Sequence, residues 1–264
     1  MKTPECVQMA EGLLKAYRTG QPIAPLTDRY PELTIADGYA IQQAQVATWR
    51  AEGRLIKGRK VGLTSAAMQR QMGVARPDFG VLHDRMFYAE SEVVPISAFI
   101  QPRVEPEVAL VLGRGLTGPG VTIADALAAV DFVLPALEII DSRIEDWRIG
   151  IVDTIADNAS SGGVVLGAHP IGPAAVDLRL LGCNLFGNGE LVATGASGAA
   201  LGSPVVSLAW LANTIGEHGD CLEAGDIVLP GSVTAAQPVQ SGDVWTAHLA
   251  ELGTVTARFS TGAA

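Results

Sequence analysis

The sequence has little of what marks several large classes of protein. Only three cysteines occur among its 264 residues, namely Cys6, Cys183 and Cys221. They are far apart, form no CxxC pair and are odd in number, which favours reduced thiols over a disulfide framework or a zinc site. The N-terminal stretch MKTPECVQMAEGLL contains no apolar core of a signal peptide, so we expect a cytoplasmic protein.

Long apolar runs and basic clusters are missing as well. The formal net charge of −10 and the pI of about 4.8, without any basic tract, argue against nucleic acid or an anionic membrane as a partner. No apolar run approaches the roughly 18 residues that a membrane span needs. The catalytic signatures GxSxG, HExxH and Walker A are also absent from the sequence.

What the chain does contain is apolar sequence in short segments. With 48% hydrophobic and 17% charged residues, its length allows a sizeable core in one large domain or two smaller ones. Apolar residues at helical spacing predict helices at 5–17 and 36–52, and Thr34 and Gly53 are the expected cap and stop of the second helix. We therefore predict a helical N-terminal segment over residues 1–55.

From about residue 56 the pattern changes to short apolar runs separated by Gly, Pro and Asp. These runs predict strands at 93–95, 104–112, 132–140, 163–166, 178–186, 191–194, 226–229, 243–250 and 254–259. Asn188-Gly189 between two of them is a type I′ hairpin signal. Only two helices are predicted here, at 123–130 after the cap Thr122 and at 205–217. Many strands with few helices indicate an α+β fold with a mixed or mostly antiparallel sheet over residues 56–264.

The predicted strand 104–112 carries two carboxylates that need an explanation. Because side chains alternate along a strand, Glu105 and Glu107 share one face, while Val104 and its apolar neighbours can pack from the other. Neighbouring carboxylates on an apolar strand repel each other and lose solvation. A third glutamate, Glu138, interrupts FVLPALEII, a segment apolar enough to be covered on both faces.

Two explanations for these glutamates stay open at this point. In the first, Arg103 and Arg143 neutralise them in a structural network of ion pairs. In the second, the three carboxylates bind a divalent cation. Because no His or Cys stands at ligand spacing, this donor set suits Mg²⁺ or Mn²⁺ better than zinc. Such an ion would hold the glutamates together and leave positions for water and substrate.

Other motifs have a structural interpretation beside a functional one. GRGLTG at 113–118 fits GxGxxG, but Pro-Gly follows it and the helix signal starts later, so a surface turn is favoured over a dinucleotide site. Lys60 in a strand-like run is either a solvated side chain or, beside a metal site, a proton donor or acceptor. Asp78 stands in PDFG, which is typical of a turn. The polar loops 157–161 and 230–232 adjoin apolar strands, a usual place for ligand contacts.

Several segments in this order resemble one family of enzymes. These are GRKVGLTSAAMQRQMGV, RPDFGVL, QPRVEPEVALVL, PALEIIDSRIEDWRI, DTIADNAS and GASGAALGSPVVSLAWLAN. Together, from about Leu26 to Phe259, they resemble the 2-hydroxypenta-2,4-dienoate (2-keto-4-pentenoate) hydratases and the related 4-oxalocrotonate decarboxylases of the fumarylacetoacetate hydrolase superfamily. The resemblance implies a mixed β-roll or sandwich of that superfamily's C-terminal type, on which the helical N-terminal segment packs.

The resemblance also implies roles for single residues and a set of partners. The implied ligands of Mg²⁺ or Mn²⁺ are Glu105, Glu107 and Glu138. The implied catalytic residues are Lys60 and Asp78, and the implied substrate contacts are Ser160, Gly231, Ser232 and Leu82. A homo-oligomer is implied as well, together with association with another enzyme of the same pathway.

The implied substrate is a 2-hydroxy-2,4-dienoate from meta-cleavage of an aromatic or sterol ring. Its carboxylate and C2 oxygen would bind the metal, which would polarise the C2 oxygen and stabilise the developing enolate. A base and an acid would then move a proton from the C2 hydroxyl to carbon, which gives an α,β-unsaturated ketone. Addition of water at C4 would yield a 4-hydroxy-2-oxo acid.

Two features of the sequence point to different members of this family. RPDFGVL carries Asp78 where the decarboxylases resemble SPIYGFL, and a carboxylate there could direct water, which favours a hydratase. The segment VTAA at 233–236 resembles the decarboxylase loop, so a 4-oxalocrotonate-type decarboxylase is the alternative. A non-catalytic stabilising subunit is a remote third interpretation, against which the retention of Lys60, Asp78 and the three glutamates argues.

Overall fold

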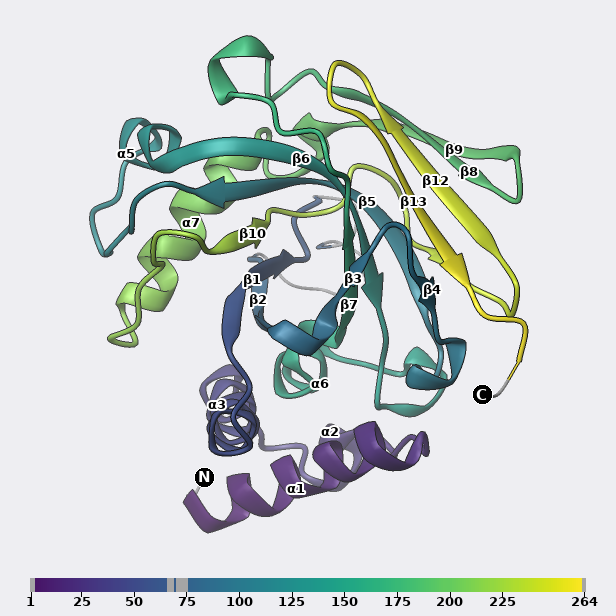
Figure 1. Cartoon of the computed structure of the whole chain (residues 1–264). Helices are drawn as coiled ribbons and strands as arrows, with labels where there is room; N and C mark the ends of the chain where they lie inside the picture. The colour runs from purple at the N-terminus through teal and green to yellow at the C-terminus, as the bar shows by residue number, and fades with distance from the viewer. Residues whose placement is uncertain (1–2, 66–68, 70–75, 263–264) are drawn as a thin grey trace.

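The structure is a computed structural model that describes residues 3–65, 69 and 76–262. The family motif GRKVGLTSAAMQRQMGV therefore lies partly outside the described residues. Figure 1 shows three N-terminal helices at one end of the molecule, away from a five-stranded sheet, with a larger curled sheet between them.

The N-terminal helices are α1 (Thr3–Thr19), α2 (Leu26–Arg29) and α3 (Ile35–Ala51). The predicted cap of the third helix is confirmed, because the Thr34 hydroxyl accepts a hydrogen bond from the Asp37 N–H and the Asp37 carboxylate accepts one from the Thr34 N–H. The buried side chain of Gln42 donates to the Phe79 carbonyl at 2.9 Å. A hydrogen bond of this kind in a dry interface fixes α3 against the sheet.

The larger sheet is mixed, as predicted, and it curls. Its strands are β1 (Ile56–Gly62), β2 (Asp78–His83), β3 (Phe87–Ala89), β5 (Arg103–Leu112), β6 (Val130–Ile140), β7 (Ser161–Leu166), β10 (Ile227–Leu229) and β11 (Gln237–Pro238). The order is β2-β1-β10-β5-β6-β7-β3, and β11 pairs with β5. The pairs β1/β10 and β3/β7 are parallel, and the others are antiparallel. Because β2 and β7 lie far apart in this order but contact each other, the sheet rolls around an interior.

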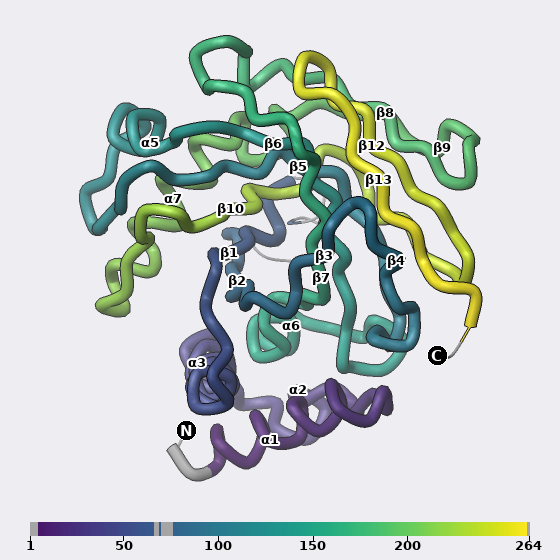
Figure 2. Tube along the Cα trace, in the orientation of Figure 1, coloured from purple at the N-terminus to yellow at the C-terminus, as the bar shows by residue number. Residues whose placement is uncertain are grey.

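The smaller sheet contains five strands in the order β4-β13-β12-β8-β9. Their bounds are β4 (Val93–Val94), β8 (Gly182–Gly187), β9 (Glu190–Ala196), β12 (Val244–Leu249) and β13 (Gly253–Phe259). Asn188 and Gly189 connect β8 to β9 with φ angles of 53° and 88°. Two successive positive φ values confirm the predicted type I′ hairpin. Figure 2 traces how the last strand returns beside β4, with which it pairs in parallel.

In the described residues from 76 onward, three α-helices accompany the strands, namely α5 (Ile123–Ala129), α6 (Ile151–Ala156) and α7 (Pro204–Gly216). Two of them were predicted. The cap of α5 is confirmed, because Thr122 forms a capping box with Asp125. The sequence pattern did not predict α6, because six residues are too few to show a helical period. Asp153 accepts a hydrogen bond from the Gly150 N–H at the start of this helix.

Two other local predictions can be compared with the structure. The strand predicted at 178–186 begins only at Gly182, because the Leu180 N–H donates to the Asp177 carbonyl and closes a turn before it. GRGLTG at 113–118 forms a mostly exposed turn, and α5 starts only at Ile123. No helix N-terminus therefore follows this motif directly, in agreement with the expected surface turn.

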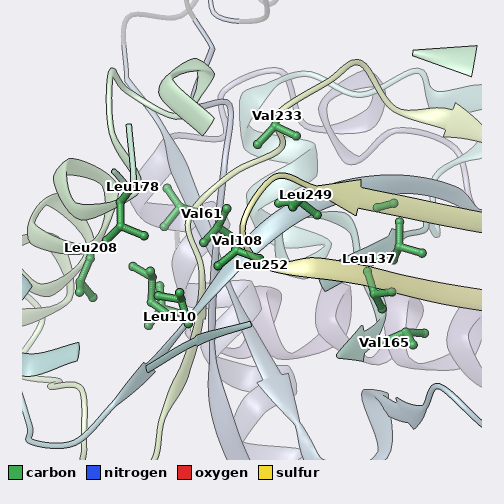
Figure 3. Close-up of a cluster of buried hydrophobic side chains, with 14 of the residues drawn as sticks. Val61, Val108, Leu110, Leu137, Val165, Leu178, Leu208, Val233, Leu249 and Leu252 are labelled. Carbon is green, nitrogen blue, oxygen red and sulfur yellow. The ribbon is translucent and has the colours of Figure 1, made fainter. Parts of the chain in front are cut away.

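The main hydrophobic core lies on one face of β5, between the sheets and α7. Figure 3 shows Val108 and Leu110 of β5 in the same buried cluster as Leu208 of α7 and Leu249 of β12. On the opposite face, Ala109 belongs to a smaller apolar cluster inside the rolled sheet. The predicted alternation of side chains along β5 is confirmed, and the face that carries the glutamates points into the roll.

One helical stretch is long and apolar enough for a membrane span by length and composition alone. It covers Ser197–Gly216 and includes α7. Half of it is buried inside the protein, and Leu208 and Leu211 belong to the main core. The packing identifies α7 as a core helix.

Candidate active site

Three glutamates of β5 and β6 converge inside the rolled sheet. Glu105 lies directly opposite Glu138 in the antiparallel register, and Glu107 is the next residue on the same face of β5. Carboxylate oxygens from the three side chains lie within 4.8 Å of one another. Glu107 and Glu138 are each only 1% exposed. The fold therefore holds three acidic groups together where water has little access.

This arrangement is electrostatically unfavourable unless a cation compensates it. Burial, together with the charge of Glu138, raises the pKa of Glu105 to about 7. Burial and the same neighbour raise the pKa of Glu107 well above its ordinary value, and burial raises that of Glu138. Glu107 Oε1 and Glu138 Oε2 accept no hydrogen bond from the described residues. Buried oxygens without donors fit a divalent cation, and an all-carboxylate set suits Mg²⁺ or Mn²⁺.

Lys60 of β1 is the cationic side chain that contacts this cluster within the described part of the chain. Its Nζ lies 3.4 Å from Glu138 Oε1 and donates a hydrogen bond to the Ala159 carbonyl at 3.0 Å. Burial lowers the pKa of Lys60, but Glu138 and the other nearby carboxylates outweigh this effect and raise the pKa above its ordinary value. Lys60 is thus a buried ammonium group and not a solvated side chain.

The arginine network that the sequence left open does not form. The fully buried guanidinium of Arg143 lies 2.6 Å from Asp157 and 3.7 Å from Asp141. Among the described residues Arg103 forms no ion pair, although its charge lowers the pKa of Glu105. Within the described part of the chain no arginine forms an ion pair with the glutamates, which favours the second explanation, a bound cation.

Asp78 lies in the same pocket as Lys60, at the first residue of β2. The predicted turn at PDFG is wrong, because Asp78 pairs with Gly62 of β1 in an antiparallel register and β2 is buried along its length. Asp78 is 1% exposed, and burial raises the pKa of its carboxyl group despite the opposing effect of Lys60. A Cβ atom at position 62 would collide with the Asp78 carboxylate, so only glycine fits there.

Ser160 ends an unusual backbone turn, Asn158–Ser160. Its three residues have φ angles of 54°, 52° and 53°, a left-handed conformation that is rare outside glycine. The Asn158 side chain anchors the turn to β2, because it accepts a hydrogen bond from the Val81 N–H at 2.8 Å and donates one to the Val81 carbonyl at 2.9 Å. The Ser160 hydroxyl lies 3.2 Å from that of Thr154. These contacts hold Ser160 at the pocket wall.

The other expected substrate contacts occupy different positions. Ser232 lines the pocket, whereas the Gly231 N–H donates to Glu107 Oε2 at 2.8 Å and so orients the Glu107 carboxylate. Leu82 lies four residues further along β2 than Asp78, in the apolar cluster inside the roll. It is fully buried there and does not line the pocket. The structure therefore does not bring Leu82 together with the other predicted site residues.

Lys60, Asp78, Arg103 and Glu105 line one pocket of about 520 Å³. Polar groups and an apolar wall share its lining, and the apolar wall consists of Val61, Ile140, Trp147, Ile149 and Val233. A second cavity of about 530 Å³ lies between α3 and the end of α7, and none of the expected site residues lines it. The chemistry therefore belongs to the pocket with the carboxylates.

Sequence reasoning missed two residues that shape this pocket. Thr154 of α6 gave no signal, because the helix itself was not recognised. Asn158 lies in a loop noted as polar, but its bonding partner Val81 is 77 residues away in sequence. Only the fold brings these two residues together.

A rolled mixed sheet with three converging carboxylates, a buried lysine and a further aspartate defines a divalent-cation enzyme acting on a small molecule. The sequence profile of the family described as "Fumarylacetoacetate (FAA) hydrolase C-terminal" matches residues 58–260, and the chain belongs to this family. The resemblance noted in the sequence and the expected fold class are thereby confirmed.

Individual relatives resemble the chain over almost its whole length. It is 46% identical over 252 residues to the 2-keto-4-pentenoate hydratase of Paraburkholderia xenovorans, a match that covers 96% of this chain and 94% of the relative. It is 41% identical over 250 residues to the 2-hydroxyhexa-2,4-dienoate hydratase of Comamonas testosteroni, which covers 94% and 95%. A solved 4-oxalocrotonate decarboxylase from Pseudomonas putida G7, complexed with magnesium and adipate, superposes with a TM-score of 0.95 at 39% identity and 98% coverage of both chains.

Proposed function

We propose that this protein is a hydratase that adds water to a 2-hydroxy-2,4-dienoate and releases a 4-hydroxy-2-oxo acid. The observation that carries the proposal is the convergence of three glutamates, two of them almost fully buried, beside the pocket that Lys60 and Asp78 line. The hydratase names of relatives at 40–46% identity support it. Such a reaction belongs to the meta-cleavage degradation of aromatic or sterol rings.

The reaction needs a C2 oxygen that can carry negative charge. A Mg²⁺ or Mn²⁺ ion held by Glu105, Glu107 and Glu138 would polarise that oxygen and stabilise enolate charge. Lys60, whose ammonium group is buried beside Glu138, donates a proton to the carbon chain and regains one from the C2 hydroxyl. The same proton equivalent enters at C5, and the dienol becomes a 2-keto-3-enoate.

The hydration step that follows uses the other proton-transfer group of the pocket. Asp78 accepts a hydrogen bond from water and directs its oxygen to C4, which is conjugate to the C2 ketone. A proton then enters at C3, so one molecule of water is added across the C3–C4 bond. Ser160 at the pocket wall offers a hydroxyl to the bound substrate. These assignments give each charged group near the carboxylates a separate task.

The proposal extends to cellular location and assembly. A cytoplasmic location agrees with three free cysteines, two of which are buried. We further propose a homo-oligomer that can associate with another enzyme of the same pathway. Light scattering on the purified protein measures the subunit number, and co-purification with the pathway's decarboxylase measures the association.

Decarboxylation of a 4-oxalocrotonate-type substrate is the second candidate. Two observations favour it, namely the close superposition on the solved decarboxylase and the position of the segment 233–236, which lines the pocket. Both reactions pass through an enolate at C2, so the carboxylate cluster does not distinguish them. Asp78 favours the hydratase, because loss of CO₂ needs no group that directs water.

One assay with two readouts tests the proposal. The purified protein is stripped with EDTA, reloaded with Mg²⁺ or Mn²⁺, and supplied separately with 2-hydroxypenta-2,4-dienoate and 4-oxalocrotonate. We expect metal-dependent loss of the dienoate absorbance with formation of 4-hydroxy-2-oxopentanoate and without CO₂. Release of CO₂ from 4-oxalocrotonate, with no turnover of the dienoate, would replace the hydratase by the decarboxylase. No turnover of either compound would refute both.

A further inference from the structure

Arg103 differs from the buried arginines of this protein. Arg59 and Arg143 are buried, and each forms an ion pair at 2.7 Å or less, with Asp220 and Asp157 respectively. Arg103 lines the pocket, and within the described residues its side chain forms neither an ion pair nor a hydrogen bond. Its guanidinium carbon instead lies 4.6 Å from the centre of the Trp147 ring. A half-buried guanidinium with unused donors can bind an anion that enters the pocket.

The register of β5 places Arg103 next to the acidic cluster. Arg103 pairs with Ile140, two residues along β5 from the pair of Glu105 and Glu138 and on the same face of the strand. Two residues along an antiparallel strand correspond to about 7 Å. A small molecule bound at the carboxylate cluster therefore extends to the guanidinium without leaving the pocket.

The groups of the pocket that we assign to proton transfer lie on elements other than that of Arg103. Lys60 and Asp78 come from β1 and β2, and Ser160 ends the turn after α6, whereas Arg103 comes from β5. The carbon atoms that exchange protons must lie near Lys60 and Asp78. The C1 carboxylate of the substrate undergoes no proton transfer. The guanidinium of Arg103 on β5, which forms no ion pair with the described residues, can donate hydrogen bonds to it.

Charge balance leads to the same assignment. With a divalent cation bound and the carboxylates ionised, the four negative charges of Asp78 and the three glutamates would be balanced by the cation, Lys60 and Arg103 together. Without Arg103 the pocket would carry a net negative charge and repel an anionic substrate. The stacked Trp147 ring leaves the edge of the guanidinium free, and this edge is the part that binds a carboxylate with two hydrogen bonds.

We infer that Arg103, held by Trp147, binds the C1 carboxylate of the 2-oxo or 2-hydroxy acid substrate and sets its orientation in the pocket. The inference rests on the proposed function and adds a substrate-binding residue to it. It predicts that the carboxylate end points to β5, and that the chain from C3 onward lies toward Lys60 and Asp78.

Pyruvate is a suitable probe, because it contains the carboxylate and the C2 oxygen but no chain beyond C3. Its binding to the Mg²⁺-loaded protein is measured by calorimetry for the wild type and for Arg103→Gln, Arg103→Lys and Trp147→Leu. We expect Arg103→Gln to weaken pyruvate binding about 10- to 100-fold, as for loss of a charge-assisted pair. Arg103→Lys keeps the charge without the planar pair of donors and should recover part of this loss. Trp147→Leu should give a smaller loss.

Controls separate a role in binding from a role in folding or in metal affinity. Arg114→Gln removes an exposed arginine outside the pocket and should leave pyruvate binding unchanged. Mg²⁺ affinity and melting temperature should stay close to wild type in Arg103→Lys, which keeps the test valid even if Arg103→Gln folds poorly.

Two outcomes would overturn this inference alone, and a third would overturn the proposed function as well. If Arg103→Lys and Arg103→Gln bind pyruvate as the wild type does but lose affinity for the dicarboxylate 4-oxalocrotonate, Arg103 binds the far end of the substrate instead. If neither ligand is affected, Arg103 has no role in binding. If the wild type itself shows no Mg²⁺-dependent binding of pyruvate, the proposed function fails, and this inference fails with it.

Discussion

The ammonium group of Lys60 lies 3.4 Å from the carboxylate of Glu138, and the two side chains are 5% and 1% exposed. They come from β1 and β6, which are not neighbours in the sheet. The rolled sheet brings them together across its interior. Because charges this deeply buried interact through little water, removal of either partner affects both the stability of the metal-free protein and its chemistry.

Lys60→Met should abolish turnover and destabilise the metal-free protein by about 3–5 kcal/mol, since it leaves Glu138 without its cationic partner. Urea unfolding in EDTA measures the free energy of unfolding. Adding Glu138→Gln should recover most of that stability in the double variant, but no activity. If the double variant instead loses as much free energy of unfolding as the two single variants together, the two side chains do not interact directly.

Glu107→Gln should have opposite effects on the metal-free and the metal-loaded protein. Removing one of three repelling, buried carboxylates should leave the metal-free protein at least as stable as the wild type. The variant should lose the rise in melting temperature that Mg²⁺ or Mn²⁺ gives the wild type, since fewer ligands mean weaker binding. Scanning calorimetry with EDTA or with the metal measures both effects. An unchanged rise in melting temperature would argue against Glu107 as a ligand.

Asp78→Asn should keep metal binding and lose most of the hydration. The amide has nearly the same shape but cannot accept the proton of water, so we expect turnover of the dienoate to fall about 100-fold or more. Steady-state kinetics measure the fall, and Mg²⁺ titration by calorimetry checks the metal site. Asp131→Asn, at an exposed position on β6, serves as the matched control. Full turnover in Asp78→Asn would remove Asp78 from the mechanism.

Asn158→Asp tests the left-handed turn that carries Ser160. The substitution replaces the amide that donates to the Val81 carbonyl and places a carboxylate against that oxygen. We expect a loss of about 1–3 kcal/mol in the free energy of unfolding. Turnover should fall more than KM rises, because the turn also supplies the Ala159 carbonyl that holds Lys60. Asn184→Asp, at an exposed position of β8, should match the wild type in both measurements.

His83 should make stability depend on pH between about 4 and 6.5. Burial, together with the nearby charge of Arg54, lowers the pKa of His83 to about 4, while Asp84 opposes and Arg85 reinforces the shift. Its Nε2 lies 3.1 Å from the Arg54 guanidinium. Below pH 6.5 the unfolded chain takes up a proton that the folded protein refuses until about pH 4. The free energy of unfolding therefore falls as the pH drops through this window and is level above it.

The free energy of unfolding is measured for the wild type and for His83→Gln with saturating Mg²⁺ at several pH values. The difference between the two proteins reports the effect of His83. The difference should change by up to about 1.4 kcal/mol per pH unit inside the window and not at all above it. His248→Gln, at an exposed position, is the control and should follow the wild type. Parallel curves for wild type and His83→Gln would mean that His83 protonates equally in both states.

Local patterns in the sequence determined much of the fold. The alternation along β5 predicted which face carries Glu105 and Glu107, because a strand has a period of two whatever surrounds it. The caps Thr34 and Thr122 and the hairpin at Asn188-Gly189 depend on contacts within a few residues, and each occurs as predicted. The three glutamates were recognised as a group, since carboxylates in apolar strands require compensation.

Only the tertiary structure decided what compensates the three glutamates and what surrounds them. Arg143 had the right charge, but the fold pairs it with Asp157 and leaves Lys60 to contact Glu138. Asp78 resembled a turn residue, and its place in a buried strand follows from pairing with Gly62 across the sheet. These relationships join residues far apart in the chain, so no local pattern contains them. They arise when the rolled sheet buries its apolar faces and brings the remaining polar side chains into one pocket.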